Sequence, residues 1–369
     1  MPRSEAAGAT LRVDLAAIAG NYRLLAERAA PARVAAVLKA DAYGLGAAQV
    51  GPALAAAGCR RFFVAHGFEG EALRAALPEV EIFVLHGPPA GCEAEFRARR
   101  LVPVLNDLAQ IERWRRQAGG GPLPAALHVD TGMNRLGLSE PEVARLAAEP
   151  ERLSGIAVGL VLSHLVVGEA PADPTNERQR QRFERLRARL PGAPASLANS
   201  SGSFLGTAFH YDWVRPGAAL YGINPTPGRL NPMREVVGLS TPILALREVA
   251  AGEGVGYGPE YRATATRRIA TVAVGYADGY ARVLGGRAEA RLAGRVVPLV
   301  GRVSMDLITL DVSDVPRALA RTGAMVDLIG GGIAIDDLAD RAGTNAYELL
   351  TRLCPRLARV HGPTAEPAA

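Results

Sequence analysis

Lys39 is the only lysine of the chain, and it lies in the middle of residues 35–46, AAVLKADAYGLG. The rest of the 42 lysine and arginine residues are arginines, so any other side-chain cation of this kind is a guanidinium. An arginine keeps its proton, whereas a lysine that is removed from water can lose one and form an imine with a carbonyl. A single amine after an apolar run therefore indicates a nucleophile, although an ion pair with Asp41 would also account for it.

Two segments offer hydroxyls and backbone amides that could hold an anion. Residues 199–203, NSSGS, contain Ser200, and residues 215–222, RPGAALYG, offer the amides of Gly217 and Ala218. Amides at turns and helix starts bind phosphate groups. Serine and glycine are also ordinary loop residues, so a phosphate site is indicated only in combination with other groups.

The elements that would position these residues follow a regular alternation. Short apolar runs alternate with amphipathic segments from residue 34 onward, which is typical of βα units around a parallel sheet. The expected strands are 34–40, 61–66, 81–86, 101–105, 125–130, 158–164, 195–199 and 213–215, and the expected helices include 69–77, 107–117, 140–149 and 176–190. This α/β pattern of eight units in about 200 residues predicts a (β/α)8 TIM barrel, for which we take residues 1–230 as the domain.

The strand count places polar residues at one end of the barrel. The residues that close an expected strand are Lys39, Asp130, His164, Asn199 and Arg215. In such barrels the catalytic groups lie at the C-terminal ends of the strands, and a phosphate often lies in the last two loops. An isolated histidine is usually structural, so the combination carries the argument. A lysine that faces a phosphate site implies pyridoxal 5'-phosphate as the cofactor, bound to Lys39 as an imine.

A mostly β second domain is expected over residues 231–369, where apolar runs are broken by glycine and short helices occur near 335–342 and 345–353. Ahead of the barrel, we expect a strand at 10–14 that packs with this second domain, followed by a helix. The glycine-rich residues 252–261 lack the GK[ST] of a nucleotide loop and are interpreted as a turn region.

Composition excludes several classes of protein. The net charge is +5, but the arginines are interspersed with acids and form no run of like charge, which speaks against a nucleic-acid partner. The three cysteines, Cys59, Cys92 and Cys354, show no CxxC spacing, so neither a disulfide framework nor a metal site is expected. Without a signal-like or membrane-spanning apolar segment, we expect a soluble, cytoplasmic protein.

Over almost its whole length the sequence resembles the alanine racemases, which are fold-type III pyridoxal phosphate enzymes. The resemblance rests on AVLKADAYGLG, HVDTGMNRLG, NSSGS, VRPGAALYG, GVGYGPEY, VAVGYADGY, GRVSMDLITLDV and NAYELLTRL. It implies racemisation of alanine through two bases, supply of D-alanine for peptidoglycan, and a homodimer with shared active sites. Lys39 would be one base, and Tyr257 of the partner subunit would be the other.

The resemblance also implies roles for further residues. Around the cofactor, Arg215 would face the pyridine nitrogen, His164 would link Arg215 to the tyrosine base, and Arg135 would lie near the phenolic oxygen and the substrate carboxylate. The phosphate contacts would come from Tyr43, Ser200, Gly217 and Ala218. From the second domain, the Met305 amide would meet the substrate carboxylate, with Asp306 behind it and Tyr276 near the entrance.

Two positions depart from the family pattern. Many members have a lysine, often carbamylated, where this chain has His128, so Arg135 must be oriented differently. A family tyrosine that helps to bind phosphate is replaced by Pro355.

Three alternatives remain beside alanine racemisation. A broad-specificity or serine racemase would share the same motifs, because these do not fix the size of the entrance. A decarboxylase for ornithine or diaminopimelate has a different second-domain signature. A noncatalytic pyridoxal phosphate-binding barrel would lack the residues after 230.

Overall fold

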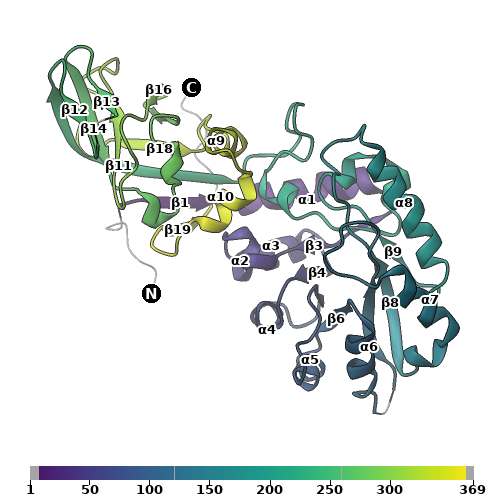
Figure 1. Cartoon of the computed structure of the whole chain (residues 1–369). Helices are drawn as coiled ribbons and strands as arrows, with labels where there is room; N and C mark the ends of the chain where they lie inside the picture. The colour runs from purple at the N-terminus through teal and green to yellow at the C-terminus, as the bar shows by residue number, and fades with distance from the viewer. Residues whose placement is uncertain (1–7, 120, 259, 363–369) are drawn as a thin grey trace. The chain divides into compact units, whose positions relative to one another are not determined.

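The computed structural model describes residues 8–119, 121–258 and 260–362. The chain divides into two compact units (Figure 1). The barrel unit comprises Ile18–Leu220 and Asn224–Met233, and the strand-rich unit comprises Met1–Ala17, Tyr221–Ile223 and Arg234–Ala369.

The barrel unit contains parallel strands that form a closed ring. Seven of them make one sheet in the order β3-β4-β5-β6-β7-β8-β9, and β10 pairs with β2. Amide hydrogen bonds from Ala35 to Val214 and from Arg215 to Ala198, both 2.9 Å, connect β10 to its neighbours on either side. The (β/α)8 prediction is therefore confirmed. The strands are β2 (Arg33–Val34), β3 (Ala36–Val37), β4 (Arg61–Val64), β5 (Glu81–Val84), β6 (Val102–Leu105), β7 (Leu123–His128), β8 (Ile156–Leu162), β9 (Ala195–Ser196) and β10 (Trp213–Val214). Only Ala35 separates β2 from β3, and these two segments together form the first of the eight barrel strands.

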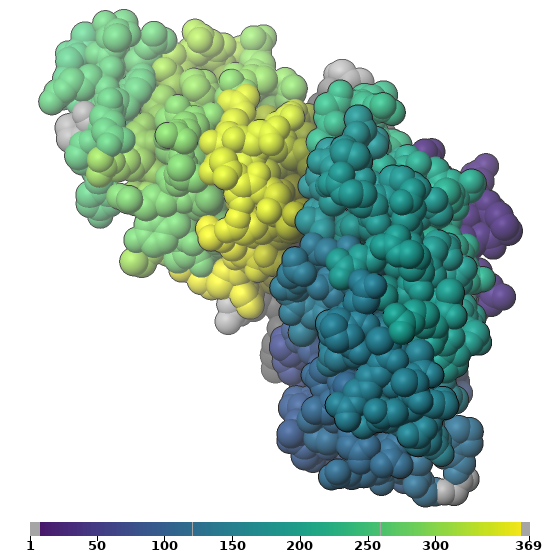
Figure 2. All heavy atoms as spheres, turned by 45° about the vertical axis from the view of Figure 1, so that its right-hand side comes forward, coloured from purple at the N-terminus to yellow at the C-terminus, as the bar shows by residue number. Residues whose placement is uncertain are grey.

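Helices follow the strands and cover the outside of the ring (Figure 1). In Figure 2 the face of this unit that is turned to the reader is coloured blue to teal, which marks residues from the middle of the chain. Asp107 caps α6, and Ser139 with Glu142 forms a capping box at α7. The four expected helices are confirmed as α4, α6, α7 and α8, whereas α2, α3 and α5 were not predicted. The helices are α1 (Leu15–Ala29), α2 (Lys39–Tyr43), α3 (Ala47–Ala56), α4 (Gly67–Ala76), α5 (Glu93–Ala98), α6 (Leu108–Arg115), α7 (Glu140–Ala148) and α8 (Pro174–Arg187), with short 3-10 turns η1 (Pro150–Leu153), η2 (Gly202–Phe204), η3 (Thr207–Phe209) and η4 (Ala218–Tyr221).

The interior of the ring is a packed apolar core. It includes Phe63 and Phe83, whose rings stack with centroids 4.8 Å apart, together with Val104, Leu160 and Trp213. Because these strands are buried on both faces, their sequences are continuous apolar runs rather than alternating ones. The core supports the strand ends that carry the polar residues.

The strand-rich unit is built on a mostly antiparallel sheet with the order β16-β15-β18-β11-β1-β19, and β14 joins β11 to β17. Strand β1 pairs antiparallel with β11 and parallel with β19. The pattern did not predict β15 and β19, which are four residues each and contain arginine. The elements are β1 (Thr10–Val13), β11 (Val237–Val249), β12 (Gly254–Val255), β13 (Tyr261–Arg262), β14 (Arg267–Val272), β15 (Glu289–Leu292), β16 (Arg295–Pro298), β17 (Ile308–Asp311), β18 (Met325–Ile329), β19 (Ala358–His361), α9 (Ile335–Ala342), α10 (Ala346–Arg352), η5 (Tyr276–Asp278) and η6 (Arg282–Leu284).

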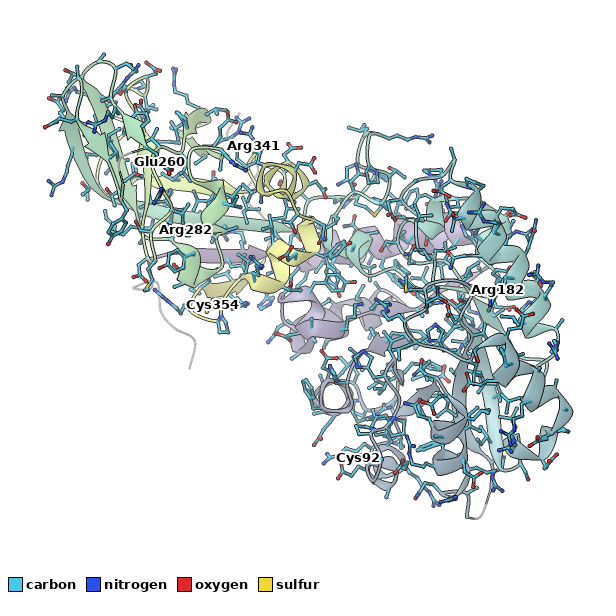
Figure 3. All side chains as sticks on the ribbon, viewed as in Figure 1. Cys92, Arg182, Glu260, Arg282, Arg341 and Cys354 are labelled. Atoms are coloured by element: carbon cyan, nitrogen blue, oxygen red, sulfur yellow. The ribbon has the colours of Figure 1, made fainter. Side chains whose placement is uncertain are left out.

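Three further features concern the cysteines, metal ligands and membrane spans. All three cysteines are free thiols, and Figure 3 labels Cys92, before α5, and Cys354, after α10. Within the described residues, no group of three or more His, Cys, Asp or Glu side chains is arranged to hold a metal ion. No described helix combines the length and apolarity that crossing a membrane requires.

Candidate functional site

Lys39 begins a turn instead of closing a strand. Ala40, Asp41, Ala42 and Tyr43 have φ between 53° and 58°, so α2 contains one turn of left-handed helix without glycine. Each such residue costs about 1–2 kcal/mol, so other contacts must hold the turn. A carboxylate oxygen of Glu69 accepts the Ala40 amide at 2.6 Å, and the Asp41 carboxylate accepts the Ala47 amide at 2.7 Å. The sequence pattern did not reveal Glu69, because it lies 29 residues after Ala40.

The environment of Lys39 favours its neutral amine. Burial lowers the pKa of Lys39 below its ordinary value, the positive charge of Arg135 lowers it further, and Glu69 opposes both effects. A lysine whose pKa is depressed in this way is unprotonated, and therefore nucleophilic, over a wider range of pH.

The two expected anion-binding segments meet beside Tyr43. The Ser200 hydroxyl accepts the amides of Gly217 at 3.0 Å and Ala219 at 3.1 Å. A Cβ atom on Gly217 would lie 2.4 Å from the Tyr43 hydroxyl oxygen, so only glycine allows this approach. The structure thus brings Tyr43, Ser200 and Gly217 together, with Ala218 between the two donating residues. Ala219 was not predicted.

Arg215 is the buried cation of the site. It is 4% exposed, and it donates to the Ser196 hydroxyl and the Ser163 carbonyl, both at 2.5 Å. Within the part of the chain that the structure describes, no carboxylate forms an ion pair with it. Burial lowers the pKa of Arg215 to about 10, so the guanidinium remains charged at neutral pH. The positioning residues Ser163 and Ser196 carry no motif that the sequence analysis could have used.

Two histidines near this cation are held neutral. Burial, followed by the charges of Arg215 and Lys39, keeps the pKa of His164 well below 6.5. Burial, followed by the charge of Arg215, lowers the pKa of His128 to about 4. The Asn106 amide donates to the Val104 carbonyl at 2.9 Å, so its oxygen faces the His128 Nδ1 at 2.8 Å. The proton of His128 therefore lies on Nδ1, and its Nε2 carries the lone pair.

Arg135 lies in a loop that Asp130 organises. One carboxylate oxygen of Asp130 accepts the amides of Gly132 and Met133 at 2.9 Å and that of Asn134 at 3.2 Å. The Arg135 side chain is exposed and makes no ion pair with the described residues, although its charge lowers the pKa of Lys39, His128 and His164. Asp130 thus fixes the backbone of the loop that carries Arg135. Asn199, the remaining expected strand-end residue, accepts the Gly202 amide at 2.9 Å and shapes its own loop.

These residues fit pyridoxal 5'-phosphate. The amine has a lowered pKa, hydroxyl and amide groups cluster where a side chain on Gly217 would clash, and a cation is buried without a carboxylate. An aldehyde that carries a phosphate matches the first two features, and an unprotonated ring nitrogen matches the third.

The strand-rich unit presents a second set of candidates on loops. Tyr257 lies in the turn between β12 and β13 and is 73% exposed. The residue before it, Gly256, has φ of +79°, and Gly258 after it has φ of +53°, so the tyrosine stands between two left-handed residues. An ion pair between Glu260 and Arg302 ties the end of this hairpin to the strand-rich unit, where Figure 3 labels Glu260.

Tyr276, Met305 and Asp306 lie together in the same unit. The Tyr276 amide donates to the Ser304 carbonyl at 3.1 Å, and the Ala277 amide donates to the Met305 carbonyl at 3.0 Å. The Met305 amide has no hydrogen-bond partner among the described residues. Asp306 pairs with Arg356 at 2.7 Å. Pro355, the residue that departs from the family pattern, is exposed next to Arg356.

The barrel, its lysine and its anion-binding loops define a class of protein, namely pyridoxal phosphate enzymes of the barrel type. The model of the alanine racemase N-terminal domain matches residues 13–225, and that of the C-terminal domain matches residues 236–361. The chain belongs to the alanine racemase family.

Individual relatives agree with this assignment. The alanine racemase of a Methylobacterium species is 52% identical to this chain, and the alignment covers 96% of this chain and 98% of that protein. The alanine racemase of Rhodospirillum rubrum is also 52% identical, and the alignment covers 99% of each chain. The solved alanine racemase of Bartonella henselae, with covalently bound pyridoxal phosphate, has a TM-score of 0.92 at 38% identity, covering 96% of this chain and 99% of that one.

Proposed function

We propose that Lys39 and the residues around it bind pyridoxal 5'-phosphate and interconvert L-alanine and D-alanine. The chain is an amino-acid racemase by its family. The observation that carries the assignment of residues is the position of the only lysine, with its lowered pKa, at the end of the barrel where the Ser200 and Gly217 segments meet. In the same proposal the enzyme works in the cytoplasm and supplies D-alanine for peptidoglycan.

When bound, pyridoxal phosphate supplies an aldehyde that condenses with amines and a ring that withdraws electrons from the substrate α-carbon. Lys39 provides the amine that holds the cofactor and then exchanges a proton at one face of the α-carbon. Tyr43, Ser200, Gly217 and Ala218 hold the phosphate. Arg215 would hold the ring nitrogen, and because a charged arginine gives up no proton, that nitrogen would stay unprotonated.

Arg135 binds the substrate carboxylate, and the neutral His128 stands where many family members have a lysine, often carbamylated. Arg135 has no carboxylate partner among the described residues, so its guanidinium is available for bidentate binding. His128 contributes no charge, because its pKa is about 4. The positive charge in the site therefore comes from Arg135 and Arg215, and no negative charge at position 128 offsets it.

Tyr257 exchanges a proton at the opposite face, and it reaches the site of a partner subunit in a homodimer. Met305 contributes its amide to the substrate carboxylate, with Asp306 behind it, and Tyr276 lies near the entrance. The support is that Tyr257, Met305 and Tyr276 are 73%, 54% and 42% exposed on loops of the strand-rich unit, so their side chains are accessible to a second chain.

The experiment is incubation of the purified protein, loaded with pyridoxal phosphate, with a series of L-amino acids, followed by chiral chromatography. D-alanine should be the main product, and comparable D-serine would indicate a broad-specificity racemase. Release of an amine and carbon dioxide, or no turnover, would refute the proposal. Borohydride reduction and peptide mapping should place the pyridoxyl group on Lys39.

A further inference from the structure

One buried polar residue on the outer helix α8 contacts two of the loops that carry the site. The inward face of α8 consists of Asn176, Gln179, Phe183 and Leu186. Gln179 is only 2% exposed, although it stands among charged residues in the sequence. A buried amide is costly unless its hydrogen bonds are satisfied, so its partners show what it does.

Gln179 uses its whole amide in three hydrogen bonds. The Nε2 group donates to the Thr131 hydroxyl at 3.1 Å and to the His164 carbonyl at 3.0 Å, and Oε1 accepts the Val166 amide at 2.8 Å. The orientation of the amide is unambiguous, because a reversed amide would set a donor against the Val166 amide and an acceptor against the His164 carbonyl. One side chain thus fixes the loop after β7 and the loop after β8.

The contacts continue to the buried cation. The Thr131 hydroxyl lies 2.7 Å from the Ser163 hydroxyl, and the Ser163 carbonyl accepts Arg215 at 2.5 Å. Thr131 directly follows Asp130, whose carboxylate shapes the loop that ends in Arg135. Gln179 therefore connects, through buried groups, to the backbone of His164, to the loop that carries Arg135 and to the Ser163 carbonyl that Arg215 binds.

We propose that Gln179 is a positioning residue for racemisation, which holds the loops after β7 and β8 so that Arg135, His164 and Arg215 keep their relative geometry. This inference rests on the proposed function of that site. Displacement of reacting groups by about 1 Å can lower a rate roughly 100-fold, so a residue outside the site can have a large effect.

Asn176 offers a matched control on the same helix face. It is 3% exposed, and its Nδ2 donates to the carbonyls of Val167 at 3.2 Å and Ala170 at 3.0 Å, which follow the Gln179 contacts in the loop after β8. Within the described part of the chain, its side chain makes no hydrogen bond to the loop after β7. Gln179→Met and Asn176→Met each replace a buried amide by an apolar side chain on α8, which Arg182 marks in Figure 3. The two variants differ in which segments lose their hydrogen bonds.

The first measurement uses the full chain without cofactor. Hydrogen–deuterium exchange should increase in peptides covering 129–138 and 163–166 for Gln179→Met, and not for Asn176→Met. With cofactor and alanine, we expect kcat to fall roughly 10- to 100-fold for Gln179→Met and less than about 2-fold for Asn176→Met. Equal effects of the two variants on exchange and on kcat would overturn the inference while leaving racemisation by the wild type intact.

A second pair keeps the inference testable if Gln179→Met does not fold. Thr131→Val removes the hydroxyl that joins Gln179 to Ser163, whereas Thr131→Ser retains it. Thr131→Val should lower kcat and increase exchange in the same peptides, and Thr131→Ser should restore both. If Thr131→Val behaves as the wild type, Gln179 does not act through this path. If the wild-type protein does not racemise alanine at all, the proposed function fails instead.

Discussion

The barrel unit and the strand-rich unit present their candidate residues in opposite ways. In the barrel unit, Arg215 and Ser200 are 4% and 8% exposed and hydrogen-bonded to neighbouring strand ends. In the strand-rich unit, Tyr257 and Met305 are 73% and 54% exposed and lie on loops. Apart from Arg135, which is exposed on its loop, the barrel unit thus holds its residues in place by itself, whereas the loops of the other unit present surfaces that a second chain can cover.

The difference follows from the two kinds of sheet. All the strands of a barrel end at the same rim, so groups that are distant in sequence converge and are removed from water together. This convergence causes the lowered pKa of Lys39, His128 and His164. An antiparallel sheet instead ends in hairpins whose tips extend into solvent, as the β12–β13 hairpin does with Tyr257.

The largest expected effect tests whether the two units act across a dimer. Lys39→Ala and Tyr257→Phe should each be nearly inactive as separate proteins. After the two are mixed under conditions that exchange subunits, heterodimers should contain one intact site, with Lys39 from one chain and Tyr257 from the other. Random pairing should then restore about a quarter of wild-type activity.

Mixing each variant with itself is the control. Activity that stays at the level of the separate variants, although native mass spectrometry detects heterodimers, would contradict the shared site.

The second effect compares two tyrosines of one hairpin. Tyr257→Phe removes the proposed base and should lower kcat by about 10²–10⁴, because a positioned base contributes an acceleration of that order. Tyr261→Phe removes a hydroxyl that lies 3.4 Å from Asp311 and should change kcat by less than about 3-fold. Similar losses in both variants would show that the hairpin fold, and not the Tyr257 hydroxyl, is needed.

The third effect concerns acid stability in the barrel unit. The pKa of His128 is about 4 in the folded chain, so between pH 6.5 and 4 the unfolded chain binds more protons and unfolding becomes easier as pH falls. The difference between the ordinary pKa of 6.5 and the folded pKa of about 4 corresponds to about 3 kcal/mol in the free energy of unfolding. Between pH 7 and pH 4, the free energy of unfolding of His128→Asn should therefore fall by about 3 kcal/mol less than that of the wild type, as measured by urea unfolding. Equal losses in both proteins would show that His128 is not held neutral.

The smallest effect tests the left-handed turn. Ala40 has φ of 53°, so Ala40→Gly removes about 1–2 kcal/mol of strain and adds about 0.5–1 kcal/mol of chain entropy cost. A net stabilisation of up to about 1.5 kcal/mol should raise the melting temperature. In the right-handed helix α3, Ala53→Gly should instead destabilise by about 0.5–1 kcal/mol. Destabilisation in both variants would contradict the strained geometry.

Much of the barrel could be predicted because its signal is local. Each strand of the barrel is an apolar run that is followed by a polar residue, and this alternation identified all eight strands within a few residues. Short helices such as α2 and α5 were missed, since five or six residues give no helical periodicity. Strands β15 and β19 were missed because each has only four residues and contains an arginine, so neither forms an apolar run.

The sequence by itself determined the family, the barrel and the single amine at position 39, because these depend on residue types and on order along the chain. Only the tertiary structure decided the conformation and charge of the site. Ala40 to Tyr43 contain no glycine, so local preference opposes their left-handed turn, and Glu69 helps to hold it. Likewise, the neutrality of His128 and the contacts of Gln179 arise from burial against residues that are distant in sequence.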